Sequence, residues 1–150
     1  MLQFGYFSEI AILIFNFIFS FKLPICFRQR GMVMKKTKML KKNYEFKKVL
    51  TKGKCFSGKY IMAFIQKNNS KRLNFLGLAI STKVCKAVGR NRLKRLIRES
   101  YLLEESKIPE GYSIVFLWNK REKPENAYFK NIYDDVKKIF SKAELYSEKG

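Results

Sequence analysis

One sixteen-residue stretch of this chain, residues 83–98, combines strong basic charge with a helical spacing of apolar residues. It holds seven basic residues and no acidic one. Arginine and lysine side chains at fixed positions bind phosphate oxygens, and arginine does so through a planar fork of N–H groups. The stretch therefore predicts binding of a polyanion, above all the phosphates of a nucleic acid. The alternative is an ordinary solvated helix face, which is the usual role of a charged run.

A helix over about residues 87–107 is needed to position these cations. At 100° per residue, one apolar arc faces the core and comprises Leu93, Leu96, Ile97, Ser100 and Leu103. A second, cationic arc comprises Arg90, Asn91, Lys94, Arg95 and Arg98. Arg92 stands apart, on the opposite flank of the apolar arc. This split predicts contacts on two sides of the helix.

The composition narrows the class of protein. The chain has 150 residues, a formal net charge of +20 and a pI near 10.0. This charge favours an anionic partner, either a nucleic acid or a membrane surface. Only three of the 32 basic residues fall in residues 1–34, so the basic character belongs to the remainder. At this length we expect one main domain with a modest core.

The residues that usually perform hydrolysis are missing or badly placed. The chain has no histidine, which excludes Ser–His or Cys–His catalysis and metal sites with imidazole ligands. Its three cysteines form no C-x-x-C motif, which fits a reducing cytosol. Asp134 and Asp135 point about 100° apart on a helix, so they form no two-metal cradle and are predicted to be solvated. Glu99 is interpreted as a helical partner of Arg95. We therefore predict no catalytic side chain and no protein-held metal.

The first 33 residues differ from the rest. Residues 10–21 form a twelve-residue apolar run, which is shorter than the roughly 20 residues of a membrane span. A short membrane anchor over residues 10–27 is one interpretation. The favoured one is that residues 1–33 are an extension upstream of a working start at Met32 or Met34, because a basic run begins at Lys35. The predicted domain then covers residues 34–150.

The remainder predicts an α+β domain. A basic arm over residues 35–42 precedes a short helix that Asn43 can cap and that stops near Gly53. Strands are predicted over residues 56–66, 73–81 and 112–118, and a final amphipathic helix over residues 127–145. In the first strand Tyr60, Met62 and Phe64 are expected to face one way. Four aromatic residues near basic ones could stack unpaired bases: Tyr44, Phe46, Tyr60 and Phe64. The alternative role for these rings, above all for Tyr60 and Phe64, is packing in the core.

Two motifs resemble the protein subunit of bacterial ribonuclease P, and they are separated along the chain as they are in that family. The stronger is GLAISTKVCKAVGRNRLKRLIRE over residues 77–99, which is similar to the family's R-N-R signature and the strand end before it. The other is LKKNYEFKKV over residues 40–49, followed by Gly53, which matches the family's N-terminal helix. The resemblance covers about residues 36–146.

The resemblance implies a fold and an activity. The expected fold is α+β, with a short N-terminal helix, a four-stranded mixed sheet, the basic helix in a left-handed βαβ crossover and a C-terminal helix, the ribosomal protein S5 domain 2-like type. The implied activity is ribonuclease P, in which a catalytic RNA uses Mg²⁺ held mainly by that RNA to remove the 5′ leader of precursor tRNA. The resemblance further implies a cytoplasmic protein, bound 1:1 to the RNA, with no small-molecule ligand.

The resemblance also implies roles for individual residues. Residues expected to bind the RNA subunit are Arg90, Asn91, Arg92 and Arg95, supported by Lys83, Lys86, Lys94 and Arg98. Residues expected in a leader-binding cleft between the first helix and the sheet are Phe46, Leu50, Tyr60 and Phe64. Leu50 stands where the family often has an aromatic residue, and Thr82 where lysine is common. Two other readings remain: a non-enzymatic RNA- or DNA-binding module like a ribosomal protein, and a membrane-anchored basic protein.

Overall fold

A computed structural model describes residues 33–70 and 72–146 of the chain. The apolar N-terminal run and the interpretations that rest on it lie outside these residues. The described part holds three α-helices: α2 (Asn43–Lys52), α3 (Ala87–Glu104) and α4 (Phe129–Lys142). It also holds five strands: β1 (Thr37–Met39), β2 (Lys54–Ser57), β3 (Ile61–Lys67), β4 (Asn74–Ala79) and β5 (Tyr112–Trp118). Short 3₁₀ turns at Glu105–Lys107 and Pro124–Asn126 follow α3 and precede α4.

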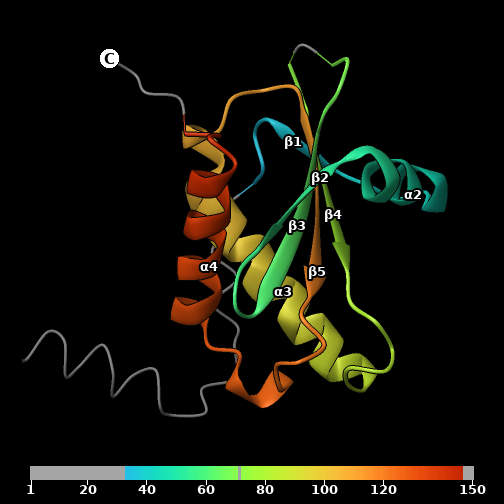
Figure 1. Cartoon of the computed structure of the whole chain (residues 1–150), viewed down its shortest axis with the longest axis vertical. Helices are drawn as coiled ribbons and strands as arrows, with labels where there is room; N and C mark the ends of the chain where they lie inside the picture. Colours follow the sequence, from blue (N-terminus) through green and yellow to red (C-terminus); the bar gives the residue numbers. More distant parts are fainter. Residues whose placement is uncertain (1–32, 71, 147–150) are drawn as a thin grey trace, which may run out of the picture. The chain divides into compact units, whose positions relative to one another are not determined.

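The strands form one mixed sheet in the order β1-β4-β5-β3-β2. β4 is parallel to both β1 and β5, whereas β3 is antiparallel to β5 and β2. Helix α3 joins the adjacent parallel strands β4 and β5, which confirms the predicted βαβ crossover. Its left-handed sense stays a prediction. Figure 1 shows the sheet edge-on, with α3 and α4 on one side and α2 on the other.

The main core lies between the sheet and the pair α3 and α4. Alternation in β3 points Ile61, Ala63 and Ile65 into this core. The sequence pattern predicted that they face away from Met62 and Phe64, without saying which face is buried. The predicted final amphipathic helix contributes three fully buried side chains: Ile132, Val136 and Ile139. Two aromatic residues, Phe116 and Phe140, fill the space between the sheet and the helices.

Helix α3 confirms most of its predicted apolar arc. Leu93, Ile97 and Ser100 are buried, but Leu103 is 40 % exposed, so its predicted place in the core is wrong. Tyr101 and Glu104 are buried instead. Near its end the buried side of α3 thus includes Tyr101 and Glu104 instead of Leu103. Tyr101 contacts β1, where its hydroxyl lies 2.9 Å from Thr37 Oγ1.

The sheet has five strands, whereas the resemblance implies four and the sequence pattern predicts three ranges; two features explain the two strands beyond those three ranges. The predicted strand over residues 56–66 is two strands, β2 and β3, separated by a turn at Gly58. The predicted basic arm contains β1, whose backbone pairs with β4. Glu105 holds the start of this strand by accepting the backbone N–H groups of Lys35 and Lys36 at 3.3 and 3.0 Å. Both features depend on residues far away in the sequence: β1 on β4 and Glu105, and the turn before β3 on Asp135.

Asp135 is not the solvated helix residue that the sequence predicted. Its side chain is 2 % exposed, and Oδ2 accepts the backbone N–H groups of Tyr60 and Ile61 at 2.6 and 3.3 Å. Burial of a carboxylate is tolerated when backbone donors satisfy it. Asp135 therefore ties α4 to the turn between β2 and β3. The N-cap of α2 also differs, since the helix begins after Lys42 rather than being capped by Asn43.

A second buried carboxylate, Glu104, joins the end of α3 to α4. Oε1 accepts the hydroxyl of Tyr133 at 2.6 Å and Lys107 Nζ at 3.1 Å, and Oε2 accepts the hydroxyl of Tyr146 at 3.0 Å. Burial by itself raises the pKa of Glu104, but the donors from Tyr133, Lys107 and Tyr146 outweigh it and hold the pKa below its ordinary value of 4.5. The ionised form is thus the one that the fold stabilises.

We expect Glu104→Gln to flatten the acid side of the stability profile. Because the folded-state pKa is lowered, the carboxylate contributes stability above the ordinary pKa, and this contribution is lost as pH falls through the folded-state pKa. Urea denaturation at neutral pH and in acid should therefore show a large difference between wild type and variant only at neutral pH. Glu99→Gln, at an exposed site on the same helix, is the control. An equal loss at both pH values would contradict the prediction.

Candidate nucleic-acid interface

The first half of α3 carries the predicted RNA-binding cations, and its Arg90 and Arg92 have fixed orientations. Arg90 Nη1 donates to the carbonyl oxygen of Cys85 at 2.8 Å, in the turn before the helix. Arg92 Nη2 donates to the carbonyl oxygen of Ala127 at 2.9 Å, just before α4. The two arginines therefore lie on different flanks of α3, as the separation of Arg92 from the cationic arc predicted. Each guanidinium retains further N–H donors for a ligand.

The remaining predicted residues surround this pair on the turn and the helix. Asn91, Arg95, Lys83 and Lys86 are exposed, and Lys94 and Arg98 are half-buried. Arg95 Nη2 lies 3.9 Å from Glu99 Oε1, with both side chains about half exposed. An exposed ion pair of this kind contributes little to the stability of the fold. Within residues 33–70 and 72–146, no other cation of this group lies within 4.0 Å of a carboxylate. The surface thus presents concentrated positive charge for a polyanion.

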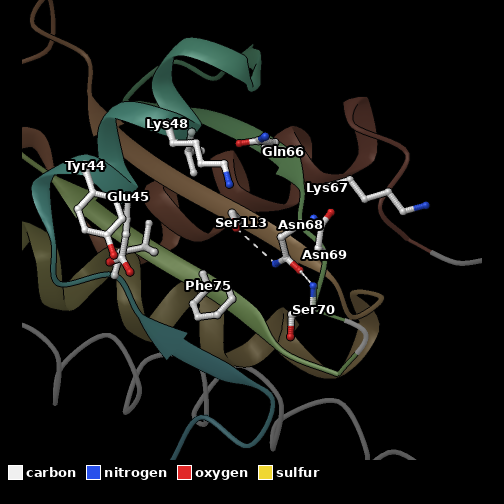
Figure 2. A pocket seen from close by; sticks show the side chains of 12 residues that line it. Tyr44, Glu45, Lys48, Gln66, Lys67, Asn68, Asn69, Ser70, Phe75 and Ser113 are labelled. Carbon is white, nitrogen blue, oxygen red and sulfur yellow. Dashed lines mark hydrogen bonds between the residues drawn. The ribbon is translucent and has the colours of Figure 1, made fainter.

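On the opposite face of the sheet, α2 and the strands form a cleft of about 310 Å³. It is lined by Leu40, Tyr44, Glu45, Lys48, Val49, Gln66, Lys67, Asn68, Asn69, Ser70, Phe75 and Ser113. Figure 2 shows Tyr44 and Lys48 on α2, with Phe75 on the strand below them. Tyr44 is 64 % exposed. The cleft therefore combines aromatic surface, an ammonium group and amides, which suit bases and phosphates of a single strand.

The polar end of this cleft has an ordered backbone. Asn68 Nδ2 donates to Ser113 Oγ and to the carbonyl oxygen of Leu73, both at 3.3 Å. Asn68 Oδ1 accepts the backbone N–H of Ser70 at 2.7 Å. These bonds fix the turn that connects β3 to the following segment, and Figure 2 marks two of them. The side-chain amide of Asn68 is thus held in place on the rim.

Phe64, one of the predicted cleft residues, lies on the face of the sheet that α2 covers. Phe64 in β3 and Gly77 in β4 both pair with Val115, which places all three positions on one face. A Cβ atom at Gly77 would lie 2.7 Å from Phe46 Cε1, so the absence of a side chain lets α2 approach the sheet. Leu50 is half-buried on the same helix. Phe46, Leu50 and Phe64 are not among the residues that line the cleft volume itself.

Tyr60 lies apart from the other predicted cleft residues. Its ring centroid is 6.3 Å from that of Trp118, and its hydroxyl accepts Asn131 Nδ2 from α4 at 3.3 Å. It packs against the core on the α4 side, so the expectation that it faces the same way as Phe64 is wrong. The cause is the turn at Gly58, which ends the alternation before Ile61.

Two aromatic residues that line the cleft, Tyr44 and Phe75, are not among the four residues predicted for the leader-binding cleft. Tyr44 is one of the predicted stacking residues but not one of the predicted cleft residues, and Phe75 belongs to neither set. Phe75 is two residues before Gly77 in the predicted strand over residues 73–81, and residues two apart in a strand share a face. Phe75 therefore lies on the face against which α2 packs. That alternation was the available signal. The alternation alone does not assign Phe75 to the cleft, because the sequence does not show which face of the sheet the helix covers.

The described residues contain no cluster of three or more His, Cys, Asp or Glu side chains that could hold a metal ion. Nor does this part of the chain contain a helix both long and apolar enough to cross a membrane.

Comparisons with known proteins agree on one family. Residues 34–144 match the family model described as Ribonuclease P. The ribonuclease P protein component of Clostridioides difficile (strain 630) is 40% identical over 111 residues, covering 73% of this chain and 95% of the relative. That of Clostridium acetobutylicum is 38% identical over 117 residues, covering 76% and 97%.

Solved structures show the same fold. The Staphylococcus aureus ribonuclease P protein superimposes with a TM-score of 0.64 at 23% identity, covering 73% of this chain and 97% of that one. The Thermotoga maritima protein gives a TM-score of 0.61 at 26% identity, covering 75% and 99%.

Proposed function

This chain belongs to the ribonuclease P protein family, and from that premise we propose how its two surfaces divide the work of the holoenzyme. Members of the family are subunits of the ribonuclease P ribonucleoprotein in tRNA processing, and their partner is the ribonuclease P RNA. Helix α3 binds that RNA, and the cleft between α2 and the sheet binds the 5′ leader of precursor tRNA. The domain that does this begins near residue 34.

The single observation that supports the first role is the pair of oriented arginines on α3. Arg90 and Arg92 are held on opposite flanks by carbonyl groups of their own chain. They can therefore contact two RNA segments, or two sides of one groove. The supporting cations add phosphate contacts along the same helix and the turn before it: Lys83, Lys86, Lys94, Arg95 and Arg98, with Asn91 as a further donor.

We assign the catalytic chemistry, and the Mg²⁺ that supports it, mainly to the RNA subunit. Residues 83–98 offer cations rather than the oxygen ligands that Mg²⁺ prefers. The protein acts by offsetting the repulsion between two RNA molecules, one copy to each RNA subunit, in the cytoplasm. This effect is electrostatic, so its benefit is largest at low salt and low Mg²⁺.

Cleavage of precursor tRNA by the cognate RNA tests this proposal. The full-length protein should stimulate cleavage strongly at low Mg²⁺ and less at high Mg²⁺. Stimulation that is absent at every Mg²⁺ concentration would overturn the proposal and favour a binding module of another kind.

The leader-binding role predicts an effect of Tyr44 that depends on leader length. Tyr44→Ala should weaken holoenzyme binding of a precursor with a long leader about fivefold or more, the cost of one lost base–aromatic stack. Tyr44→Phe keeps the ring and should retain affinity. Binding of mature tRNA, which has no leader, serves as the internal control and should not change. The same loss for mature tRNA would show that Tyr44 does not contact the leader.

A further inference from the structure

The surface next to Arg92, at the connection between β5 and α4, has no part in the two roles proposed above. The bond from Arg92 to the carbonyl oxygen of Ala127 brings its guanidinium to the residue that immediately precedes Tyr128. Tyr128 is 59 % exposed, although it belongs to a folded connection between β5 and α4. Figure 1 shows this orange connection at the same end of the domain as the start of α3. An exposed aromatic residue thus directly follows the residue whose carbonyl group binds Arg92 of α3.

Tyr128 is held firmly by backbone bonds. It is the N-cap residue of α4, its N–H donates to the carbonyl oxygen of Asn126 at 3.1 Å, and its own carbonyl accepts the N–H of Ile132 at 3.2 Å. The connection before it is fixed as well, because Trp118 Nε1 donates to the carbonyl oxygen of Glu122 at 2.9 Å. Because the backbone of Tyr128 is already ordered, less entropy is lost when a ligand stacks on its ring.

The surroundings of Tyr128 carry net positive charge. Four exposed cations belong to this connection and the first turn of α4: Lys120, Arg121, Lys123 and Lys130. Glu122 and Glu125 are the acidic residues between them. The combination of an exposed ring with surrounding cations is the arrangement that binds unpaired nucleotides, with the base on the ring and the phosphates among the cations.

We propose that Tyr128 stacks an unpaired nucleotide of the ribonuclease P RNA, and that Arg92 contacts the adjoining phosphate. This inference rests on the proposed function of α3. It names the RNA subunit rather than the precursor leader because Tyr128 adjoins α3, whereas the leader cleft lies across the sheet under α2. The RNA contact thereby extends from α3 onto the start of α4, and Arg92 belongs to that extension.

Affinity for the RNA subunit without precursor, measured over a series of salt concentrations, tests the proposal. Tyr128→Ala should weaken binding about five- to hundredfold with an unchanged salt slope, because stacking releases no counterions. Tyr128→Phe should bind like wild type. Arg92→Ala should instead reduce the salt slope by about one. Leu103→Ala, at an exposed apolar residue farther along α3, is the control, and melting curves verify that each variant is folded.

The possible failures are distinguishable. Unchanged affinity for Tyr128→Ala, with Arg90→Ala still weakened, would overturn this inference and leave the proposed function standing. Unchanged affinity for both variants would overturn both. A loss for Tyr128→Ala confined to precursor binding by the holoenzyme would overturn the assignment to the RNA subunit. Protection of an unpaired nucleotide from hydroxyl radicals by wild type but not by Tyr128→Ala would support it.

Discussion

Replacing Arg90 and Arg92 together by alanine is expected to weaken binding of the ribonuclease P RNA at least about a hundredfold at moderate salt. A hydrogen bond to a charged group contributes about 1.5–3 kcal/mol, and this variant loses at least one such bond on each flank of α3. The slope of affinity against salt concentration should also fall by about two, one for each lost phosphate contact. Filter binding over a salt series measures both quantities.

The control for this double variant removes the same charge elsewhere. Lys52 and Lys54 are exposed at the end of α2 and the start of β2, so the pair Lys52→Ala and Lys54→Ala lowers the net charge equally. It should cost far less affinity if position matters more than total charge. Equal losses for the two pairs would mean that α3 provides only a diffuse positive field. Lysine at both arginine positions should give an intermediate affinity, since the charge remains and the fork is lost.

Phe140→Ala is expected to cost about 3–5 kcal/mol of unfolding free energy, the usual range for a fully buried phenylalanine. Its ring is 0 % exposed and lies about 6 Å, between centroids, from the rings of Tyr101, Phe116 and Tyr146. Those partners belong to α3, β5 and the end of the described chain, so the cavity would loosen three segments together. Urea denaturation at neutral pH measures the change.

Phe129→Ala is the matched control on the same helix. Its ring is half-buried and stacks on Tyr133 with 5.9 Å between centroids, so its removal exposes little new cavity surface. We expect a cost near 1 kcal/mol, typical of an aromatic pair outside the core. Similar costs for the two variants would contradict the assignment of Phe140 to the centre of the core.

The sequence predicted those parts of the fold that depend on local periodicity. Helix α3 repeats its apolar residues at helical spacing, so its core-facing residues Leu93 and Ile97 were identifiable, as was the separate position of Arg92. Strand β5 was identifiable as a buried apolar run between breaks. The resemblance then supplied the arrangement of these elements, which periodicity alone does not determine.

The errors share a physical cause, which is dependence on distant partners. The turn that separates β2 from β3 is stabilised by Asp135, 75 residues after Tyr60. Strand β1 is short and lies in a lysine-rich segment, and the residues just before it are held by Glu105, about 70 residues away. Tyr60 lies outside the predicted cleft because it follows that same turn, and its side chain packs on the α4 side of the sheet. The members of the cleft depended on which face of the sheet α2 covers, and no local pattern contains that information.

The bonds at the two ends of α3 have a consequence for the kinetics of assembly. Its first half is tied to Cys85 and Ala127 through the arginines, and its last turn is tied to Thr37 through Tyr101. The helix and the two arginine side chains that we propose bind RNA are therefore preorganised in the free protein, which lowers the entropy lost on binding. Complex formation should follow simple one-step association, steered by charge and fast at low salt, without a slow folding phase of the protein.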